Sequence, residues 1–199
     1  MYRNDLQGKR AGDLSARFKL KNELKCKSFQ WYLDEVYKGT KFIYDQNVRA
    51  YGFVRNPMSN LCFDILNRNE EKTSPLALFT CASRPESSYT NQVFSFTNGG
   101  EIRREETCMT AHIQTSEVEM EKCVEVDVYG PRSKRSMSKK KRKQTWLHTK
   151  GGQIINVATK DCVTSRGVSS SSNLKLAPCD PNDFNQLWWF QTYADIQVN

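Results

Sequence analysis

Three short segments of the chain alternate apolar and polar residues with a period of two. Side chains at positions i and i+2 of a strand lie on one face of a sheet, so each segment predicts a strand with one buried face. The aliphatic pairs that define these segments are Leu76 and Leu78, Val118 and Met120, and Leu174 and Leu176. Because the same pair occurs three times, the pattern favours a β-structure made of repeated units.

The N-terminal part of the chain has the periodicity of amphipathic helices instead. One apolar set follows Ser28, which is a residue type favoured as a helix N-cap, with the spacing i, i+3, i+4 and i+7. An earlier set follows Asp13 and predicts another helix. The two sets are Phe29, Tyr32, Leu33 and Val36, and Leu14, Phe18, Leu20 and Leu24. Two helices are therefore expected before the repeated β units.

The seven cysteines carry the same threefold repetition. The last six fall into three pairs separated by 15 to 19 residues: Cys62 and Cys81, Cys108 and Cys123, and Cys162 and Cys179. No two cysteines are close enough for a CxxC motif, which argues against a thiolate metal site. The regular spacing predicts three disulfides, each closing a similar loop worth about 3 kcal/mol in the chain-entropy model. Disulfides at this density require an oxidising compartment, and Cys26 is left without a partner.

A glutamine followed two positions later by an aromatic residue stands downstream of each cysteine pair. The triplets begin and end at Gln92 and Phe94, Gln144 and Trp146, and Gln186 and Trp188. The aromatic ring can fill a shared core, while the amide, with donors and an acceptor, can hold loop backbone. From about residue 45 onward the chain is thus interpreted as three repeats, named here first, second and third after the three cysteine pairs.

On these cysteine pairs and triplets the sequence resembles the ricin B-type lectin family. That resemblance implies an all-β fold, a β-trefoil of three repeats about a pseudo-threefold axis, over residues 45–199. The short α-helical segment at 1–44 precedes it. The family binds carbohydrate, so the resemblance implies a lectin module with the six paired cysteines in disulfides and the three Gln-x-aromatic triplets as structural elements.

The N-terminal segment indicates which group of lectin-containing proteins the sequence resembles. The strings Gly12–Arg17 and Leu24–Tyr37 look like the end of the catalytic domain of animal polypeptide N-acetylgalactosaminyltransferases, and Asn91–Phe96 looks like their first lectin repeat. Those Golgi enzymes begin mucin-type O-glycosylation. The resemblance implies that residues 1–44 are a remnant of the catalytic domain, in possible contact with its missing part. It also implies a Golgi or secretory location. A disulfide pattern without a signal peptide, together with the odd Cys26, fits a fragment whose upstream part, with the targeting segment and the partner of Cys26, is absent.

The resemblance also implies a sugar site. The family takes an Asp two positions after the first cysteine of a pair, an aromatic residue two before the second, and an Asn just before the Gln. The first repeat meets all three requirements with Asp64, Phe79 and Asn91. Phe79 is out of phase with Leu76 and Leu78, so its ring is expected to point away from the core. The expected ligand is GalNAc on a mucin-type O-glycopeptide.

The other two repeats depart from this pattern. At the same places the second has Thr110, Glu121 and Lys143, and the third has Thr164, Ala177 and Asn185. A single working pocket is therefore predicted. Two features of the first repeat also depart from the family pattern and count against this pocket. Ala82 stands where many members have a His, and the spacing from Cys81 to Asn91 is longer than usual. The competing interpretation is structural, with Asp64 capping a turn, Phe79 partly covered and Asn91 a loop amide.

The sequence offers no catalytic constellation. The family's transferase reaction uses manganese held by an Asp-x-His motif, but the two histidines, His112 and His148, have Thr110 and Trp146 two positions earlier. Both are read as strand or loop residues. No catalytic residue, metal site or cofactor is expected in this chain, with manganese confined to the full-length family, and no transferase activity is expected from this chain alone.

The net charge of +8 comes from one segment. Residues 132–143 contain eight Lys or Arg and no acid, and the rest of the chain is balanced. Nucleic-acid-binding surfaces usually combine basic residues with aromatic ones, and this run has none, so no nucleic acid partner is expected. No segment is apolar enough to predict a membrane span. The run is interpreted as a solvated insertion; the alternative function is a trefoil whose sugar site is lost and which acts as a scaffold or binds polyanions through residues 132–143.

Overall fold

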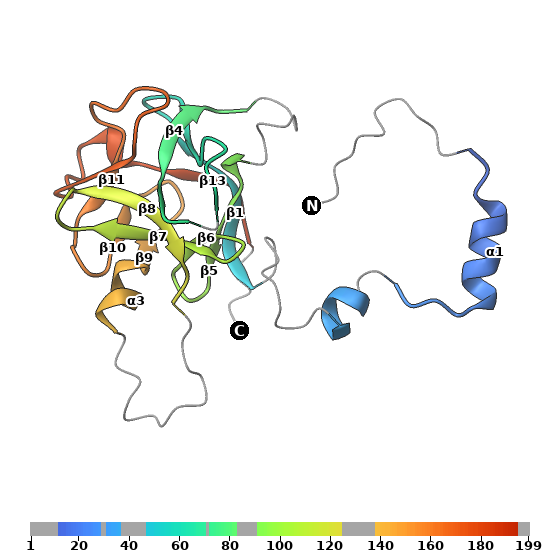
Figure 1. Ribbon diagram of the computed structural model, residues 1–199. Helices are drawn as coiled ribbons and strands as arrows, with labels where there is room; N and C mark the ends of the chain where they lie inside the picture. Colours follow the sequence, from blue (N-terminus) through green and yellow to red (C-terminus); the bar gives the residue numbers. More distant parts are fainter. Residues whose placement is uncertain are drawn as a thin grey trace. The chain divides into compact units, whose positions relative to one another are not determined.

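The computed structural model describes residues 12–28, 31–36, 47–70, 72–82, 91–124 and 138–194. It divides into two compact units, Met1–Lys41 and Phe42–Asn199, which are described separately (Figure 1). Within the described residues, no helix is long and apolar enough to cross a membrane.

The first unit contains the two helical elements that the sequence predicts, one of them in a different form. Helix α1 spans Ser15–Glu23, and Asp13 accepts the backbone N–H of Ser15 at 2.8 Å. None of its residues is buried, so its amphipathic pattern has no packed face in this unit. The second element, η1 at Tyr32–Val36, is a five-residue π-helical turn, shorter than the helix predicted after Ser28. The Ser28 hydroxyl caps its start, accepting the Trp31 N–H at 3.0 Å; Phe29 lies outside the described residues.

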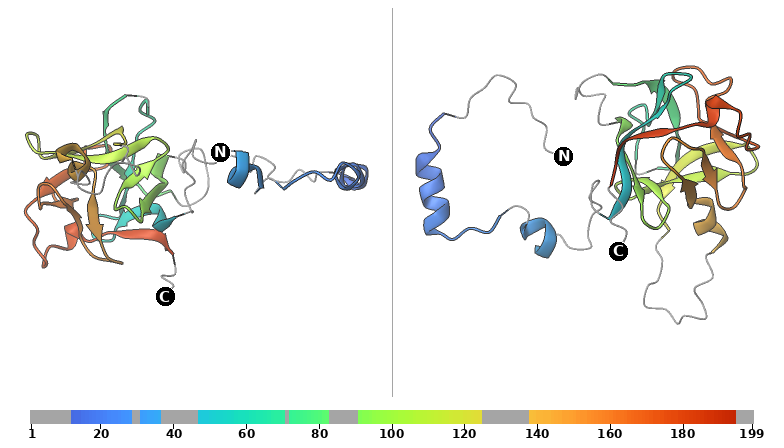
Figure 2. Two further views of the ribbon diagram at one scale, coloured as in Figure 1. Left: turned by 90° about the horizontal axis from the view of Figure 1, so that it is seen from below. Right: turned by 180° about the vertical axis from the view of Figure 1, so that it is seen from behind.

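The second unit is an antiparallel β-structure in which each repeat contains a hairpin bridged by its disulfide. The hairpins pair β2 with β4, β7 with β8, and β11 with β12. The last strand, β13, returns to pair with the first, β1, and so closes the unit (Figure 2). The strands are β1 Val48–Asn56, β2 Leu61–Asp64, β3 Ser74–Pro75, β4 Ala77–Thr80, β5 Phe94–Thr97, β6 Ile102–Arg104, β7 Thr107–His112, β8 Glu117–Lys122, β9 Trp146–His148, β10 Ile154–Asn156, β11 Cys162–Thr164, β12 Lys175–Ala177 and β13 Trp189–Tyr193, with helix α3 at Lys139–Lys143 and the 3-10 helix η4 at Phe184–Gln186.

A closed ring of backbone hydrogen bonds joins the three repeats. The Leu76 N–H donates to the Val118 carbonyl at 2.9 Å, the Val118 N–H to the Leu174 carbonyl at 3.2 Å, and the Leu174 N–H to the Leu76 carbonyl at 2.8 Å. All three side chains are fully buried. This ring lies where a pseudo-threefold axis must pass, because each repeat contributes one equivalent residue to it. The period-two pattern therefore predicted the buried faces of these segments correctly.

Three aromatic rings from the Gln-x-aromatic triplets fill the core around this ring. Phe94, Trp146 and Trp188 are completely buried. The two tryptophans donate their indole N–H to the carbonyl that follows the first cysteine of their repeat, Met109 at 2.8 Å and Val163 at 3.0 Å. Phe94 has no such donor and instead packs edge-to-face against Phe63, with 5.9 Å between the ring centroids. The rings thus combine apolar burial with satisfied polar edges.

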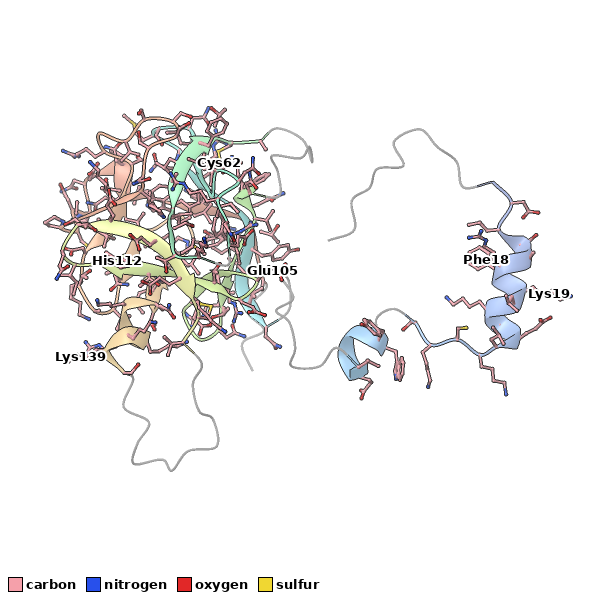
Figure 3. The ribbon with its side chains drawn as sticks, in the orientation of Figure 1. Phe18, Lys19, Cys62, Glu105, His112 and Lys139 are labelled. Carbon is pink, nitrogen blue, oxygen red and sulfur yellow. A yellow bond between two sulfur atoms is a disulfide. The ribbon has the colours of Figure 1, made fainter. Side chains whose placement is uncertain are left out.

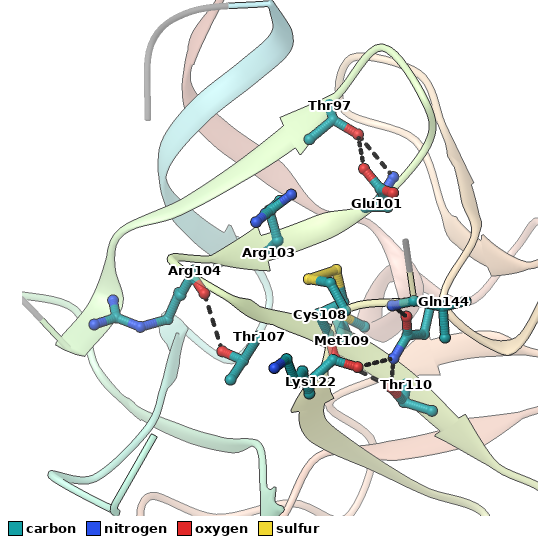
Figure 4. Close-up of a disulfide and its surroundings, with 12 residues drawn as sticks. Thr97, Glu101, Arg103, Arg104, Thr107, Cys108, Met109, Thr110, Lys122 and Gln144 are labelled. Carbon is teal, nitrogen blue, oxygen red and sulfur yellow. Dashed lines mark hydrogen bonds between the residues drawn. A yellow bond between two sulfur atoms is a disulfide. The ribbon is translucent and has the colours of Figure 1, made fainter. Parts of the chain in front are cut away.

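The three disulfides join Cys62 to Cys81, Cys108 to Cys123, and Cys162 to Cys179, as the spacing predicts, and Cys26 is a free, exposed thiol. Beside each bridge, a glutamine amide holds the backbone on both sides of the second cysteine. Gln144 donates to the Lys122 carbonyl at 3.1 Å and accepts from the Val124 N–H at 2.8 Å (Figure 4). In the first repeat the Gln92 amide donates to the Thr80 carbonyl and accepts from the Ala82 N–H, both at 2.9 Å. In the third repeat the Gln186 amide donates to the Pro178 carbonyl and accepts from the Asp180 N–H, again at 2.9 Å.

The basic run ends in a helix, which the interpretation as a solvated insertion did not foresee. Residues 132–137 lie outside the described residues, but Lys139–Lys143 form helix α3, whose first turn the Ser138 hydroxyl caps. Lys141 is buried and forms an ion pair with Glu101, and it also donates to the Val124 carbonyl at 3.2 Å. This end of the run is therefore anchored to the trefoil.

A first prediction concerns the glutamine amides. Replacing Gln144 by Met keeps the length of the side chain but leaves the Lys122 carbonyl and the Val124 N–H without their partner. Each buried group left unsatisfied costs roughly 1–3 kcal/mol, so the free energy of unfolding should fall by about 2–4 kcal/mol in urea denaturation. The exposed Gln114→Met change is the control and should have almost no effect; equal stability of the two variants would contradict this role for the amide.

A second prediction concerns the stability of the fold at acidic pH. Burial acts to raise the pKa of Glu101, but hydrogen bonds from Lys141 and Thr97 outweigh it and hold the pKa below its usual value. A carboxylate with a depressed folded pKa stabilises the fold at neutral pH, and this contribution is lost as the pH falls below about 4.3 and through the folded pKa. Glu101→Gln should therefore destabilise the chain by about 3 kcal/mol at pH 7, because it strands a buried lysine charge, and by less at pH 3.

The measurement for this second prediction is urea denaturation of wild type and variant across that pH range. The exposed Glu105→Gln change serves as the control and should leave the pH profile unchanged. A Glu101→Gln penalty that stays constant from pH 7 to pH 3 would show that the carboxylate charge is not what holds α3.

Candidate carbohydrate-binding site

Asp64 lies at the end of β2 and is held by two hydrogen bonds. Its Oδ1 accepts the Leu66 N–H at 2.6 Å, and its Oδ2 accepts from the Gln92 side-chain amide at 2.8 Å. The chain turns directly after it, with Leu66 and Asn67 at φ 51° and 55°. Asp64 is only 2% exposed. An ionised carboxylate has about four lone-pair sites, so the two internal bonds leave acceptor capacity on both oxygens.

Asn91 stands beside this carboxylate because it immediately precedes Gln92. Its carbonyl accepts the Ile65 N–H at 3.3 Å, which ties it to the turn after Asp64. Its side-chain amide donates to the Asn67 Oδ1 at 2.9 Å. The amide is thus oriented by the same turn that fixes the carboxylate.

Phe79 comes from the neighbouring strand, β4. In the β2–β4 register Asp64 lies opposite Ala77, and Cys62 lies opposite Phe79. Alternation along each strand places Asp64, Ala77 and Phe79 on one face of the hairpin. Leu78 is fully buried on the other face, whereas Phe79 is 38% exposed. The structure therefore places a fixed carboxylate and an accessible aromatic ring on one face of the hairpin, with an oriented amide bonded to the adjoining turn.

The corresponding places in the other repeats have different surroundings. Thr110 is buried and accepts from the Gln144 amide at 3.0 Å, so its hydroxyl replaces the carboxylate as a structural acceptor. In the third repeat Asn185 donates to Asp183 at 2.7 Å, and Asp183 forms an ion pair with Arg166 at 3.0 Å. Neither place presents an aromatic ring next to a carboxylate, since Glu121 and Ala177 stand where the first repeat has Phe79.

The departures within the first repeat are only partly described. Ala82 uses its backbone N–H to bond Gln92, a contact that does not depend on the side chain at this position. Residues 83–90, which carry the extra length before Asn91, lie outside the described residues. A cleft of about 340 Å³ in the described part of the chain lies elsewhere, lined by Leu147, His148, Thr149, Gly152, Gln153, Ile155, Pro181 and Leu187. It has no carboxylate, and its lining is largely apolar, so it does not offer a comparable sugar site.

The two histidines have distinct environments. His148 Nε2 is hydrogen-bonded to the Tyr193 hydroxyl at 2.9 Å, and its Nδ1 is hydrogen-bonded to the Gln153 carbonyl at 3.1 Å. Burial lowers the pKa of His148, which favours the neutral form of the ring that links β9 to β13. His112 lies instead between Glu119 and Glu121, each 3.1 Å from its Nε2. No spacing motif in the sequence predicted this cluster.

The manganese and nucleotide site of the transferase family is not matched by these residues. Neither histidine has an aspartate two positions before it, and His148 is committed to its two structural contacts.

The comparison with protein families identifies the module. The model of the ricin-type beta-trefoil lectin domain matches residues 50–132 and 133–199. The chain belongs to this family, which confirms the resemblance inferred from the cysteine pairs and the Gln-x-aromatic triplets. Its three disulfides are those of a protein from an oxidising compartment.

A probable N-acetylgalactosaminyltransferase 9 of Caenorhabditis elegans is 32% identical over 192 residues, which cover 96% of this chain and 30% of that protein. The chain thus spans less than a third of this relative, and the similarity extends beyond the trefoil. Among solved structures, GalNAc-T7 with UDP, GalNAc and Mn2+ superposes with a TM-score of 0.59 at 18% identity, covering 92% of this chain and 30% of that one. The C-half of an earthworm R-type lectin in complex with GalNAc superposes with a TM-score of 0.52 at 13% identity. The match covers 70% of this chain and 95% of that one. At these identities the structures show the fold alone.

Proposed function

We propose that this chain is a carbohydrate-binding lectin module that recognises GalNAc on mucin-type O-glycopeptides through its first repeat. The observation that carries the proposal is that Asp64 and Phe79 share one face of the β2–β4 hairpin, while Asn91 is bonded to the turn that follows Asp64. The similarity to a probable N-acetylgalactosaminyltransferase supports the choice of sugar.

Each of the three side chains has a distinct task in this proposal. The Asp64 carboxylate accepts hydrogen bonds from vicinal sugar hydroxyls, and the Phe79 ring stacks on the C–H face of the sugar. The Asn91 amide fixes the orientation of the ring. Because Asp64 is already held by Leu66 and Gln92, little side-chain entropy is lost when the sugar binds.

The larger protein that we propose around this module is a polypeptide GalNAc-transferase of the Golgi lumen. Its transferase activity requires residues outside this chain. A lectin tethered to a catalytic domain raises the effective concentration of a substrate that already carries GalNAc, so even weak affinity is useful. Phe18, Leu20 and Leu24 of the first unit are all more than half exposed and offer apolar surface for contact with that catalytic domain.

A third prediction tests the sugar site. Titration of the oxidised chain with a GalNAc-bearing glycopeptide should give saturable binding with a dissociation constant near the millimolar range, because a small polar ligand buries little surface. Phe79→Ala should weaken binding about threefold to tenfold, the usual size of an aromatic stacking contribution. Asp64→Ala should abolish it. The matched control is Phe184→Ala, which removes an exposed ring from the third repeat and should leave affinity unchanged.

Phe79→Ala is the decisive variant, since Asp64 also holds Gln92 and its loss can perturb the fold. Equal affinity of the Phe79→Ala and Phe184→Ala proteins, or no binding by the folded wild type, would contradict the site proposed here.

A second candidate function is polyanion binding through the basic run. Helix α3 presents Lys139, Lys140 and Arg142 exposed on an element that Lys141 anchors to the trefoil. Binding of a sulfated polysaccharide would weaken steeply with salt, because each neutralised charge releases counterions. This candidate predicts that replacing these three exposed residues by Ala lowers both affinity and the salt slope, while binding of a neutral glycopeptide is unaffected. A salt-independent affinity would exclude it.

A further inference from the structure

The second repeat brings three metal-ligating side chains together on its hairpin. His112 ends β7, and Glu119 and Glu121 lie two residues apart on β8, so both carboxylates are on one face of that strand. His112 Nε2 is 3.1 Å from Glu119 Oε2 and 3.1 Å from Glu121 Oε1. One ligand atom from each residue lies within 4.8 Å of the others. Figure 3 labels His112 at this position.

Two carboxylates of this cluster share one imidazole nitrogen. The Nε2 atom of an imidazole carries at most one hydrogen, yet two carboxylates converge on that nitrogen. In the described part of the chain, the ion pairs that Glu119 and Glu121 form are with His112 alone, and no Lys or Arg joins them. The three side chains are 31%, 21% and 17% exposed, so the carboxylates are only partly solvated. A bound positive ion would offset their mutual repulsion.

The backbone beneath the cluster is well fixed. Strands β7 and β8 pair over six consecutive positions, from Thr107 opposite Lys122 to His112 opposite Glu117. The disulfide between Cys108 and Cys123 closes the open end of the hairpin. Ligand atoms around zinc, at 2.0–2.2 Å from the ion, lie about 3.2–3.6 Å from one another. Rotamer adjustments are therefore enough to bring these side chains onto one ion.

The cluster occupies positions of the second repeat that correspond to those of Ala77 and Phe79 in the first. Glu121 stands two residues before the second cysteine of its pair, as Phe79 does, and Glu119 corresponds to Ala77. Thr110 takes the place of Asp64. The repeat that has lost the elements of a sugar site thus has a carboxylate where the stacking ring would be, on an accessible face.

We propose that His112, Glu119 and Glu121 form a binding site for a divalent transition-metal ion of the zinc type. Imidazole nitrogen suits zinc and its neighbours, whereas calcium requires six to eight oxygen ligands. Three protein ligands leave at least one coordination position for water. This proposal departs from the expectation from the sequence that the chain has no metal site, and it does not depend on the proposed sugar function.

The experiment uses the full, oxidised chain with Cys26 replaced by Ser, because the exposed free thiol would itself bind zinc. After treatment with a chelator and its removal, Zn2+ alone is titrated and followed by calorimetry. The expected result is saturable binding of one ion per chain. His112→Ala and Glu121→Gln should each lower the affinity about tenfold or more. The matched control is Glu105→Gln, which removes an exposed carboxylate just before the opposite end of β7 and should keep wild-type affinity.

A second measurement needs no substitution in the cluster. In NMR spectra of the Cys26→Ser chain, the ring nitrogen signals of His112 should shift with zinc while those of His148 stay in place. Absence of saturable zinc binding by the folded chain would overturn the proposal, as would binding that survives His112→Ala. Neither result bears on the first repeat, because no sugar is present.

Discussion

The ring of backbone hydrogen bonds among Leu76, Val118 and Leu174 is the interaction on which the rest of the trefoil depends. Each repeat donates one N–H to the next and accepts one from the last, so no repeat can satisfy these groups alone. The groups are fully buried, and a buried peptide group without a partner is costly. The three hairpins must therefore assemble together, and their outer faces are then held in fixed positions.

The outer faces show how a symmetric scaffold has taken on asymmetric chemistry. Each glutamine holds the backbone around a disulfide in the same way, but the third contact of its amide differs. Gln92 bonds the Asp64 carboxylate, and Gln144 bonds the Thr110 hydroxyl. The bond that stabilises the first repeat thus also positions the carboxylate proposed to bind sugar. In the second repeat the same place is structural, and the neighbouring strand carries the histidine and glutamate cluster.

Much of the fold could be predicted because its signals are local. The period-two pairs gave the buried faces and the outward direction of Phe79, and the cysteine spacing gave the three bridges. The residues of the candidate sugar site came from a family resemblance, and their use of sugar stays a proposal. The contact between Gln92 and Asp64 is what the structure adds, since it joins residues on separate elements.

Other features could not be predicted because they depend on register or on distant contacts. His112 meets Glu119 and Glu121 only through the pairing of β7 with β8, and their spacing matches no metal motif. Lys141 is buried because Glu101, far from it in the sequence, lies beside it, so a run of like charges ends in an anchored helix. An apolar periodicity of three to four residues likewise predicts a helix but does not indicate the π-helical form found at Tyr32–Val36.

The central claim is that sugar recognition belongs to the first repeat alone. The most direct test is to add the GalNAc-bearing glycopeptide to the isotope-labelled wild-type chain and map the perturbed backbone amide signals in NMR spectra. The account predicts that they cluster at Leu66, Phe79, Asn91 and their neighbours. Perturbations centred on the third repeat or on helix α3 would contradict it.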